Sequence, residues 1–332
     1  MIPLSQVNTQ SKSWQQQLAS AKITVKELLD FLELRPEQLT YSEVADQQFK
    51  LKVSWDFLNC IDKGNPDDPL LKQILPIAAE MQDWPGFGKN PVGDLEASVV
   101  PGLIHKYPSR VLLISSPACG IHCRYCFRRH FPYSESYGQL DQALKYIKEN
   151  QSINEVILSG GDPLTMSDEQ LLQLIDKIQN IAHVQTLRIH SRMPVILPDR
   201  LTDSLSKGLQ SSRLQTVMVI HCNHPSELSG YLRKGLQRFS FPALTLLNQS
   251  VLLKGVNDNS DILVELSHKL FSMGILPYYL HMLDRVEGAG HFSVALKNAI
   301  ELHKTMRSQL PGYLVPQLIR DDNGRPFKEN AY

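Results

Sequence analysis

The sequence predicts an α/β fold in which six parallel strands alternate with helices, preceded by a helical N-terminal region. Two observations support this. After Arg110, short apolar runs rich in β-branched residues recur about every 30 residues, which is the length of one βα unit. Amphipathic helical patterns separate these runs. The periodicity leaves two architectures open, an incomplete parallel barrel and a doubly wound open sheet.

Residues 1–100 are expected to be helical and irregular. Thr24 to Glu27 is a capping-box pattern, and the apolar face of a helix follows it. Prolines are frequent from Asn65 to Pro101, as in a connection that lies over a larger body. We therefore divide the chain into an N-terminal region (1–100), a strand-rich core (101–290) and a C-terminal segment with a final helix (291–332).

The expected core strands are residues 111–115, 156–159, 187–190, 217–221, 244–247 (or 251–253) and 278–280. Between them, Ser167 begins a helix with one apolar stripe, and residues 261–272 form another that ends at Gly274, a favourable C-cap.

Residues that could bind a ligand or take part in catalysis follow each predicted strand at its C-terminal end. In order, they are a cysteine loop, Ser159-Gly160-Gly161-Asp162, His190-Ser191-Arg192, residues 221–224, Asn248-Gln249 and residues 281–284. The carboxyl ends of parallel strands form the active-site face in α/β folds. A lone histidine or glycine pair is commonly structural, but six such groups in register predict an enzyme.

The cysteine loop carries three of the five cysteines, Cys119, Cys123 and Cys126, at C-x3-C-x2-C spacing. Three thiolates suit a four-iron, four-sulfur cluster with one iron left open. The alternative is a zinc site completed by His122 or His130, although zinc sites favour more regular cysteine pairs. That alternative would make the protein a zinc-stabilised, non-catalytic binding module.

Composition narrows the classes of partner. The 332 residues contain 34 Lys+Arg and 34 Asp+Glu, so no net field attracts nucleic acid or an anionic membrane. The sequence has no apolar run of about 20 residues and no secretory pattern at its start. Clustered, unpaired cysteines indicate a reducing compartment. We expect a soluble, cytoplasmic protein.

The C-x3-C-x2-C loop resembles the signature of radical S-adenosylmethionine enzymes. The resemblance implies an incomplete (βα)6 barrel that holds a four-iron, four-sulfur cluster. The open iron of that cluster would bind the amino and carboxylate groups of S-adenosylmethionine. It also implies that the cofactor is contacted by Ser159, Gly160, Gly161, Asp162, His221 and Gln249.

Five longer segments resemble the lysine 2,3-aminomutase family: residues 101–110, 158–164, 221–225, 248–258 and 277–280. The similarity runs from about Asp68 to Lys328. The short chain resembles a compact bacterial branch, the elongation factor P β-lysylation proteins, which lack the C-terminal region of the longer catabolic enzymes.

The resemblance implies pyridoxal phosphate as a further cofactor. Lys328, within the G-x-P-x-K pattern of residues 324–328, matches the lysine that binds it. Lys106, Tyr107 and Arg110 match positions that hold its phosphate. The longer enzymes have arginine at the position of Lys106, so a bidentate contact is weakened there.

The resemblance also implies the substrate contacts. Arg128 matches an anchor for the lysine carboxylate. Asp284 and Asp321 match a carboxylate pair for the distal ammonium, and Asp322 is the rival of Asp321.

The implied reaction converts (S)-α-lysine to (R)-β-lysine through a 5′-deoxyadenosyl radical and a pyridoxal phosphate aldimine, with a cellular one-electron reductant. The β-lysine would supply a β-lysine ligase that modifies elongation factor P. The alternative within this chemistry is an aminomutase of free amino-acid metabolism that acts on lysine or glutamate.

Overall fold

The computed structural model describes residues 12–136, 138–321, 325 and 327–332. Their strands form one sheet in sequence order from β1 to β10. The strands are β1 (Ser98–Val100), β2 (Leu103–Tyr107), β3 (Arg110–Ser116), β4 (Glu155–Gly160), β5 (Thr186–Ser191), β6 (Gln215–His221), β7 (Leu244–Val251), β8 (Leu276–His281), β9 (Gln317–Arg320) and β10 (Glu329–Asn330).

Strands β3 to β9 pair in parallel, each with the next in the chain. All six predicted core strands are confirmed, and the fifth is the first of its two alternatives because β7 ends at Val251. Val156 and Leu158 of β4 and Leu187 and Ile189 of β5 are almost fully buried, as alternate positions of a strand packed against helices should be.

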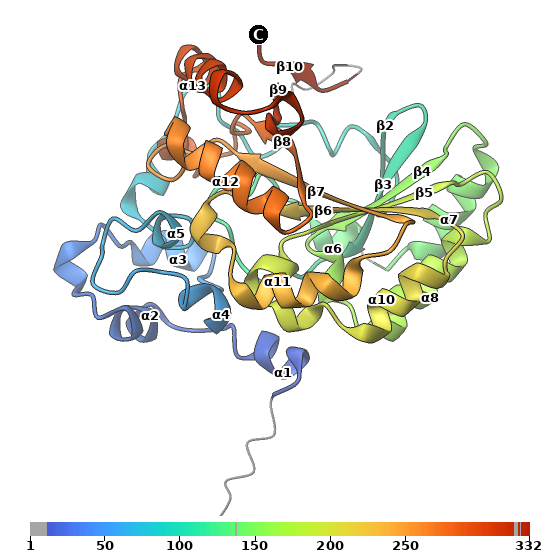
Figure 1. The fold of residues 1–332 in the computed structure, drawn as a ribbon, viewed down its shortest axis with the longest axis horizontal. Coiled ribbons are helices and arrows are strands. Elements are labelled where there is room, and N and C mark those ends of the chain that lie inside the picture. The colour runs from blue at the N-terminus through green and yellow to red at the C-terminus, as the bar shows by residue number, and fades with distance from the viewer. Residues whose placement is uncertain (1–11, 137, 322–324, 326) are drawn as a thin grey trace, which may run out of the picture.

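Helices fill the connections between the parallel strands. They include α7 (Leu140–Glu149), α8 (Asp168–Gln179), α10 (Asp203–Ser211), α11 (Gly230–Leu236), α12 (Ser260–Ser272) and α13 (Leu296–Gln309). Ser167 caps α8 with a capping box, and Gly274 follows α12 with φ +78°, both as predicted. Figure 1 shows α8, α10 and α11 below the strands.

The N-terminal region is helical, as expected, with α1 (Trp14–Ala19), α2 (Val25–Leu32), α3 (Glu43–Gln48), α4 (Trp55–Leu58) and α5 (Pro69–Lys72). Figure 1 shows α2 to α5 gathered at one end of the molecule. A single cluster of buried apolar residues includes Leu28 and Phe57 from this region together with Leu158 and Ile189 from the sheet.

Four strands were not predicted. β1 and β2 form an antiparallel addition to the edge at β3, while β9 extends the parallel series by one strand and β10 pairs antiparallel with it. These strands span two to five residues, too few for a clear alternating pattern. The division into three regions stays a prediction.

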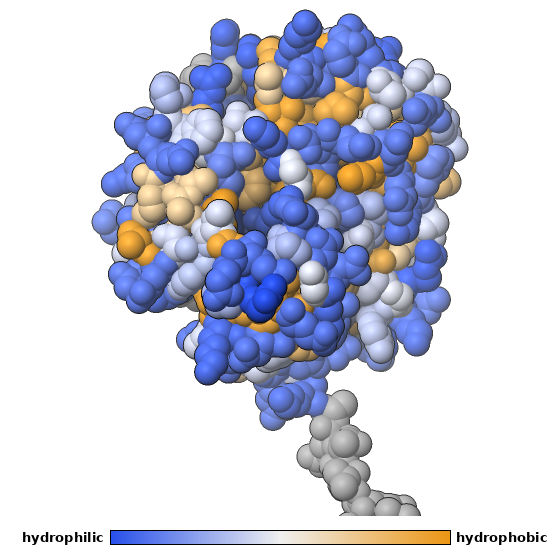
Figure 2. Space-filling model, turned by 90° about the vertical axis from the view of Figure 1, so that its left-hand side faces the viewer, coloured by the Kyte–Doolittle hydropathy of each residue, from blue (hydrophilic) through white to orange (hydrophobic). Residues whose placement is uncertain are grey.

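The face drawn in Figure 2 is mostly hydrophilic, with smaller groups of hydrophobic residues between the polar ones. Within the described ranges, no helix combines the length and apolar character that crossing a membrane requires.

Candidate active site

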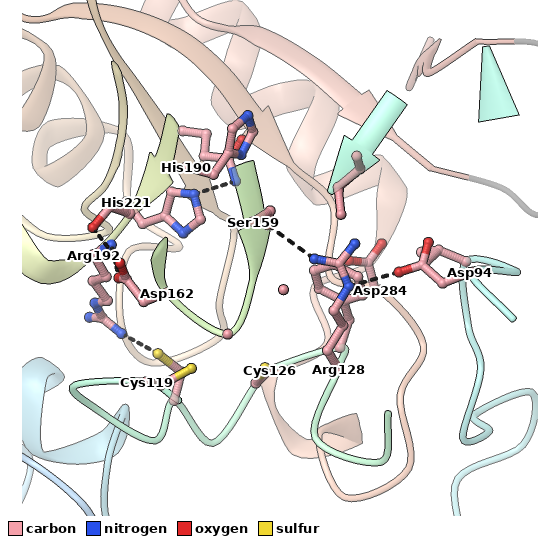
Figure 3. Close-up of a pocket in the computed structure, with 18 of the residues that line it drawn as sticks. Asp94, Cys119, Cys126, Arg128, Ser159, Asp162, His190, Arg192, His221 and Asp284 are labelled. Atoms are coloured by element: carbon pink, nitrogen blue, oxygen red, sulfur yellow. Dashed lines mark hydrogen bonds and ion pairs between the residues drawn. The ribbon is translucent and has the colours of Figure 1, made fainter. Parts of the chain in front are cut away.

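One cavity of about 650 Å³ lies at the carboxyl ends of the parallel strands. Figure 3 shows part of its lining. The residues predicted as a site come together here: Lys106, Tyr107, Arg110, Cys119, Cys123, Cys126, Arg128, Ser159, Gly160, Gly161, Asp162, His221, Gln249, Asp284, Asp321 and Lys328 all line it. Asp322, Gly324 and Pro326 lie outside the described residues.

The cysteine loop follows β3 and is closed by local and long-range hydrogen bonds. The Cys126 amide donates to the Cys123 carbonyl at 3.0 Å. The His122 amide donates to the Lys52 carbonyl at 2.9 Å, which ties the loop to the N-terminal region. Cys119, Cys123 and Cys126 all line the same cavity from this loop.

Arg124, inside the cysteine loop, is fully buried and faces the N-terminal region. Its guanidinium donates to Glu80 from Nε at 2.8 Å and from Nη2 at 2.6 Å. It also donates to the carbonyls of Ala45 and Phe49. Arg129 adds a bond to the same Glu80 carboxylate at 2.9 Å. The buried Glu80 carboxylate, from the segment that precedes β1, therefore fixes the loop.

Burial and mutual repulsion shape the chemistry of the thiols. Burial, with Cys123 nearby, raises the pKa of Cys126 to about 11, and burial raises the pKa of Cys119 well above its usual value. Bound iron stabilises the thiolate form and so offsets the free-energy cost of ionising a buried thiol.

The zinc alternative gains no support from the geometry. Within the described ranges, no three His, Cys, Asp or Glu side chains are placed to share one metal ion. His122 Nδ1 is hydrogen-bonded to the Lys50 carbonyl, and His130 Nε2 to the Glu287 carbonyl. A four-iron cluster is larger than a single ion, so its three thiolates need not converge on one point.

Gly160 and Gly161 bring β4 against the start of the cysteine loop. A Cβ atom at Gly161 would lie 2.3 Å from the Ala118 carbonyl oxygen, and Gly160 has φ +109°. Asp162 then accepts hydrogen bonds from the Ser191 hydroxyl and the Arg192 amide, at 2.7 and 2.8 Å. The two glycines therefore pack directly against the backbone at the start of the cysteine loop, and Asp162 fixes the segment to the end of β5.

Three imidazoles line the cavity from β5, β6 and β8, namely the half-buried His190 and His221 and the buried His281. Burial lowers the pKa of His221 to about 3 and the pKa values of the other two well below normal, so all three are neutral. His221 Nε2 is paired with Gln249, whereas Nε2 of His190 and Nε2 of His281 are buried without a hydrogen-bond partner among the described residues. The cavity therefore offers neutral hydrogen-bonding groups to a ligand.

Arg128 is held by a carboxylate that the sequence reasoning missed. Its Nε donates to Asp94 at 2.8 Å and its Nη1 to the Ser159 hydroxyl at 3.2 Å, as Figure 3 shows. Asp94 also accepts from Lys106 Nζ at 2.7 Å. Asp94 lies in the Pro-rich connection, where nothing in the sequence distinguishes it from other acidic residues.

Lys328, just before β10, lies in an acidic part of the cavity. Its Nζ is 3.4 Å from Asp321, and burial lowers its pKa although Asp321 and Asp284 oppose this. Burial raises the pKa of Asp284 to about 7, and the Asp321 carboxylate adds to this. A lysine with a lowered pKa is more often the neutral amine, the form that attacks a carbonyl carbon.

Tyr107 and Arg110 lie next to each other at the edge of the cavity formed by β2 and β3. The Arg110 guanidinium lies 4.1 Å from the centre of the Tyr107 ring, and burial raises the Tyr107 pKa to about 12. Together with Lys106 they place a neutral hydroxyl and two cationic side chains on one side of the site.

Comparison with known proteins places these observations in context. Residues 113–233 match the Radical SAM superfamily. The chain is 45% identical, over 99% of its length, to the L-lysine 2,3-aminomutase of Haemophilus influenzae, 98% of which it covers. It is 42% identical to the L-lysine 2,3-aminomutase of Escherichia coli, again over 99% of this chain and 97% of the relative. It is 35% identical to the Clostridium subterminale enzyme of the same name, over 94% of this chain but 76% of that protein.

Proposed function

Because this chain belongs to the L-lysine 2,3-aminomutase family of radical S-adenosylmethionine isomerases, we propose that it converts L-lysine to β-lysine and thereby supplies the modification of elongation factor P. One observation carries the proposal. One cavity is lined both by the three loop cysteines and by a half-buried lysine, Lys328, which lies 3.4 Å from Asp321 and is influenced electrostatically by Asp284. Radical generation and amine migration need these two groups within reach of one substrate.

The cysteine side suits the cluster and S-adenosylmethionine. Cys119, Cys123 and Cys126 would ligate three irons. Gly160 and Gly161 let the end of β4 pack directly against the start of the cysteine loop, where a Cβ would prevent this close approach. The neutral His221–Gln249 pair offers hydrogen bonds to the adenosyl part.

The other side suits pyridoxal phosphate. Lys328 would hold the cofactor, helped by the lowered pKa of its amine. Lys106, Tyr107 and Arg110 would hold the phosphate. Lys106 also pairs with Asp94, so it contributes less charge to a phosphate than a free lysine would.

When bound, the cluster and S-adenosylmethionine supply a carbon radical, and pyridoxal phosphate carries the migrating amine. The protein orients the reactants and keeps water away from them. Arg128 lines the cavity, is fixed there by Asp94 and Ser159, and would bind the substrate carboxylate.

The acidic pair favours lysine over glutamate. Asp321 lies near enough to Asp284 for its carboxylate to help raise the Asp284 pKa. A lysine ammonium between them would gain two opposite charges, whereas a glutamate side chain would meet two like charges. This is the observation that favours lysine within the alternatives raised by the sequence.

The decisive experiment is anaerobic incubation of the iron-reconstituted protein with lysine, S-adenosylmethionine, pyridoxal phosphate and dithionite. We expect β-lysine by mass spectrometry, and none from Cys123→Ala. Cys222→Ser is the matched control, because Cys222 is buried away from the loop and donates to the His224 carbonyl. No β-lysine from protein with a full visible iron–sulfur spectrum would contradict the proposal, as would full iron content in Cys123→Ala.

The link to elongation factor P is tested separately. The chain covers 98% of the Haemophilus relative and 76% of the clostridial one. In cells that lack their own lysine 2,3-aminomutase, expression of this chain should restore the mass increase of elongation factor P. If the protein produces β-lysine in vitro but does not restore this mass increase, the aminomutase activity stands and a role in free amino-acid metabolism is favoured.

A further inference from the structure

Arg192, which follows β5, reaches a cysteine of the loop that follows β3. Its Nη1 lies 2.8 Å from the Cys123 sulfur and 2.7 Å from the Tyr125 hydroxyl. Figure 3 shows the side chain extending from β5 toward the cysteine loop. Arg192 is 4% exposed, so this guanidinium is a buried positive charge in direct contact with a thiol.

The other end of the guanidinium is fixed by a buried polar network. Nη2 donates to Glu227 at 2.9 Å and to Gln73 at 2.7 Å. Gln73 in turn donates to Glu227 at 3.1 Å, and Asn223 donates to Gln73 at 3.0 Å and to Tyr125 at 2.6 Å. The side chains of Glu227 and Gln73 are fully buried. The network leaves the arginine one orientation, with Nη1 aimed at the sulfur.

The charges in this network are arranged unevenly around Cys123. The Arg192 cation touches the sulfur, whereas the Glu227 anion binds the far nitrogen of the same guanidinium. A nearby positive charge stabilises the more negative, reduced state of an iron–sulfur cluster, and hydrogen bonds to the cluster sulfurs act in the same direction. The effect is strong where little water is present to screen the charges.

We propose that Arg192, held in place by Glu227 and Gln73, raises the reduction potential of a cluster ligated by Cys123. This rests on the proposed function, since it requires the cysteines to bind the cluster. Arg192 would act through its contact with the Cys123 sulfur. None of the site predictions made from the sequence gave Arg192 such a role.

The test is an anaerobic redox titration of the reconstituted holoenzyme, with the reduced cluster followed by electron paramagnetic resonance. We expect Arg192→Gln to reduce the equilibrium constant for one-electron reduction at least tenfold, a shift of about −59 mV. Arg192→Lys keeps the charge and should retain most of the wild-type potential. Glu227→Gln removes the opposing anion and should shift the potential upward.

Two controls separate the effect of the Arg192 charge at the Cys123 sulfur from other effects of substitution. Tyr125→Phe removes the hydroxyl that shares Nη1 but keeps the guanidinium, so a small shift is expected. Arg213→Gln removes an arginine that bonds to carbonyls at the end of α8, and it should leave the potential unchanged.

The outcomes separate this inference from the function it rests on. A wild-type protein that binds no cluster overturns the proposed function. An intact cluster at wild-type potential in Arg192→Gln overturns only the role of Arg192. Equal downward shifts in Arg192→Lys and Arg192→Gln, or loss of the cluster from both, would assign Arg192 a packing role and overturn the electrostatic one. If Glu227→Gln does not fold, the comparison of Arg192→Lys with Arg192→Gln still tests the electrostatic role of Arg192.

Discussion

Asp284 combines burial with a like charge nearby, and both raise its pKa, to about 7. Below that pH the group is protonated and has no charge with which to attract a lysine ammonium. We therefore expect kcat/KM for lysine to rise with pH through about 7, since this parameter reports pKa values of the free enzyme. Kinetics across this range, measured at constant cluster content, provide the check.

Two variants identify the group responsible. Asp284→Asn should lose this inflection and lower kcat/KM by about 30- to 4,000-fold, corresponding to a lost charged partner at roughly 2–5 kcal/mol. Asp321→Asn removes the repulsion and should move the inflection to lower pH. A wild-type profile in Asp284→Asn would remove that residue from the substrate pocket.

Lys328 is the residue on which the pyridoxal phosphate proposal depends. Lys328→Ala should lose the Schiff-base absorbance while the iron chromophore remains, because the lysine and the cysteine loop lie on different elements. The exposed Lys269, paired with Glu265 on α12, supplies a control whose replacement should keep both absorbances. Borohydride reduction and peptide mapping that placed the cofactor on Lys254 or Lys269 would refute the assignment.

Among the elements, the cysteine loop depends on a segment far from it in sequence. Glu80 neutralises Arg124 and Arg129, and all three side chains are at most 2% exposed. Glu80→Ala would leave two buried cations without their partner, so we expect a loss of about 3–5 kcal/mol. A lower urea midpoint for the protein would show it.

The matched control is Glu33→Ala. Glu33 pairs with Lys63 at 3.1 Å on the surface, where such a pair contributes about 0–1 kcal/mol. Equal midpoints for the Glu80 and Glu33 variants would mean that the buried network does not hold the loop.

The contact between β4 and the cysteine loop makes a sharper structural prediction. A Cβ at Gly161 would meet three backbone atoms of Pro117 and Ala118 at 2.3 to 2.8 Å, and backbone cannot rotate aside as a side chain can. Gly161→Ala should therefore displace the loop and reduce iron loading after reconstitution. Gly230→Ala, which meets nothing within 4 Å, should load iron normally. Normal iron content in Gly161→Ala would show that the loop tolerates the shift.

Across the whole molecule, the sequence predicted the elements with a regular hydrophobic pattern and the segments in which reactive residues are clustered. The six core strands and the helix signals at Ser167 and Gly274 follow from local patterns, because burial on a sheet and capping of a helix need particular residues at fixed spacing. The residues that meet in the cavity were predictable because they follow strand ends or match long motifs.

What could not be predicted depends on contacts between distant segments. Asp94 and Glu80 are single acidic residues in an irregular connection, and their roles appear only when Arg128 and Arg124 are folded against them. β9 and β10 are too short to carry a pattern. Arg192 was visible as a strand-end residue, but its contact with Cys123 joins segments 69 residues apart, so no spacing in the sequence indicates it.

Asp94 is one carboxylate that serves two cations, Arg128 and Lys106. An anion that binds either cation draws it away from the shared carboxylate, which can then pair more fully with the other. The two anionic ligands proposed for this cavity, the cofactor phosphate and the substrate carboxylate, are thus linked through one group. Such linkage is reciprocal: whatever one ligand does to the affinity of the second, the second does to the first. Because Asp94, Arg128 and Lys106 share their charges in this way, loading of the proposed cofactor would change the affinity of the site for lysine.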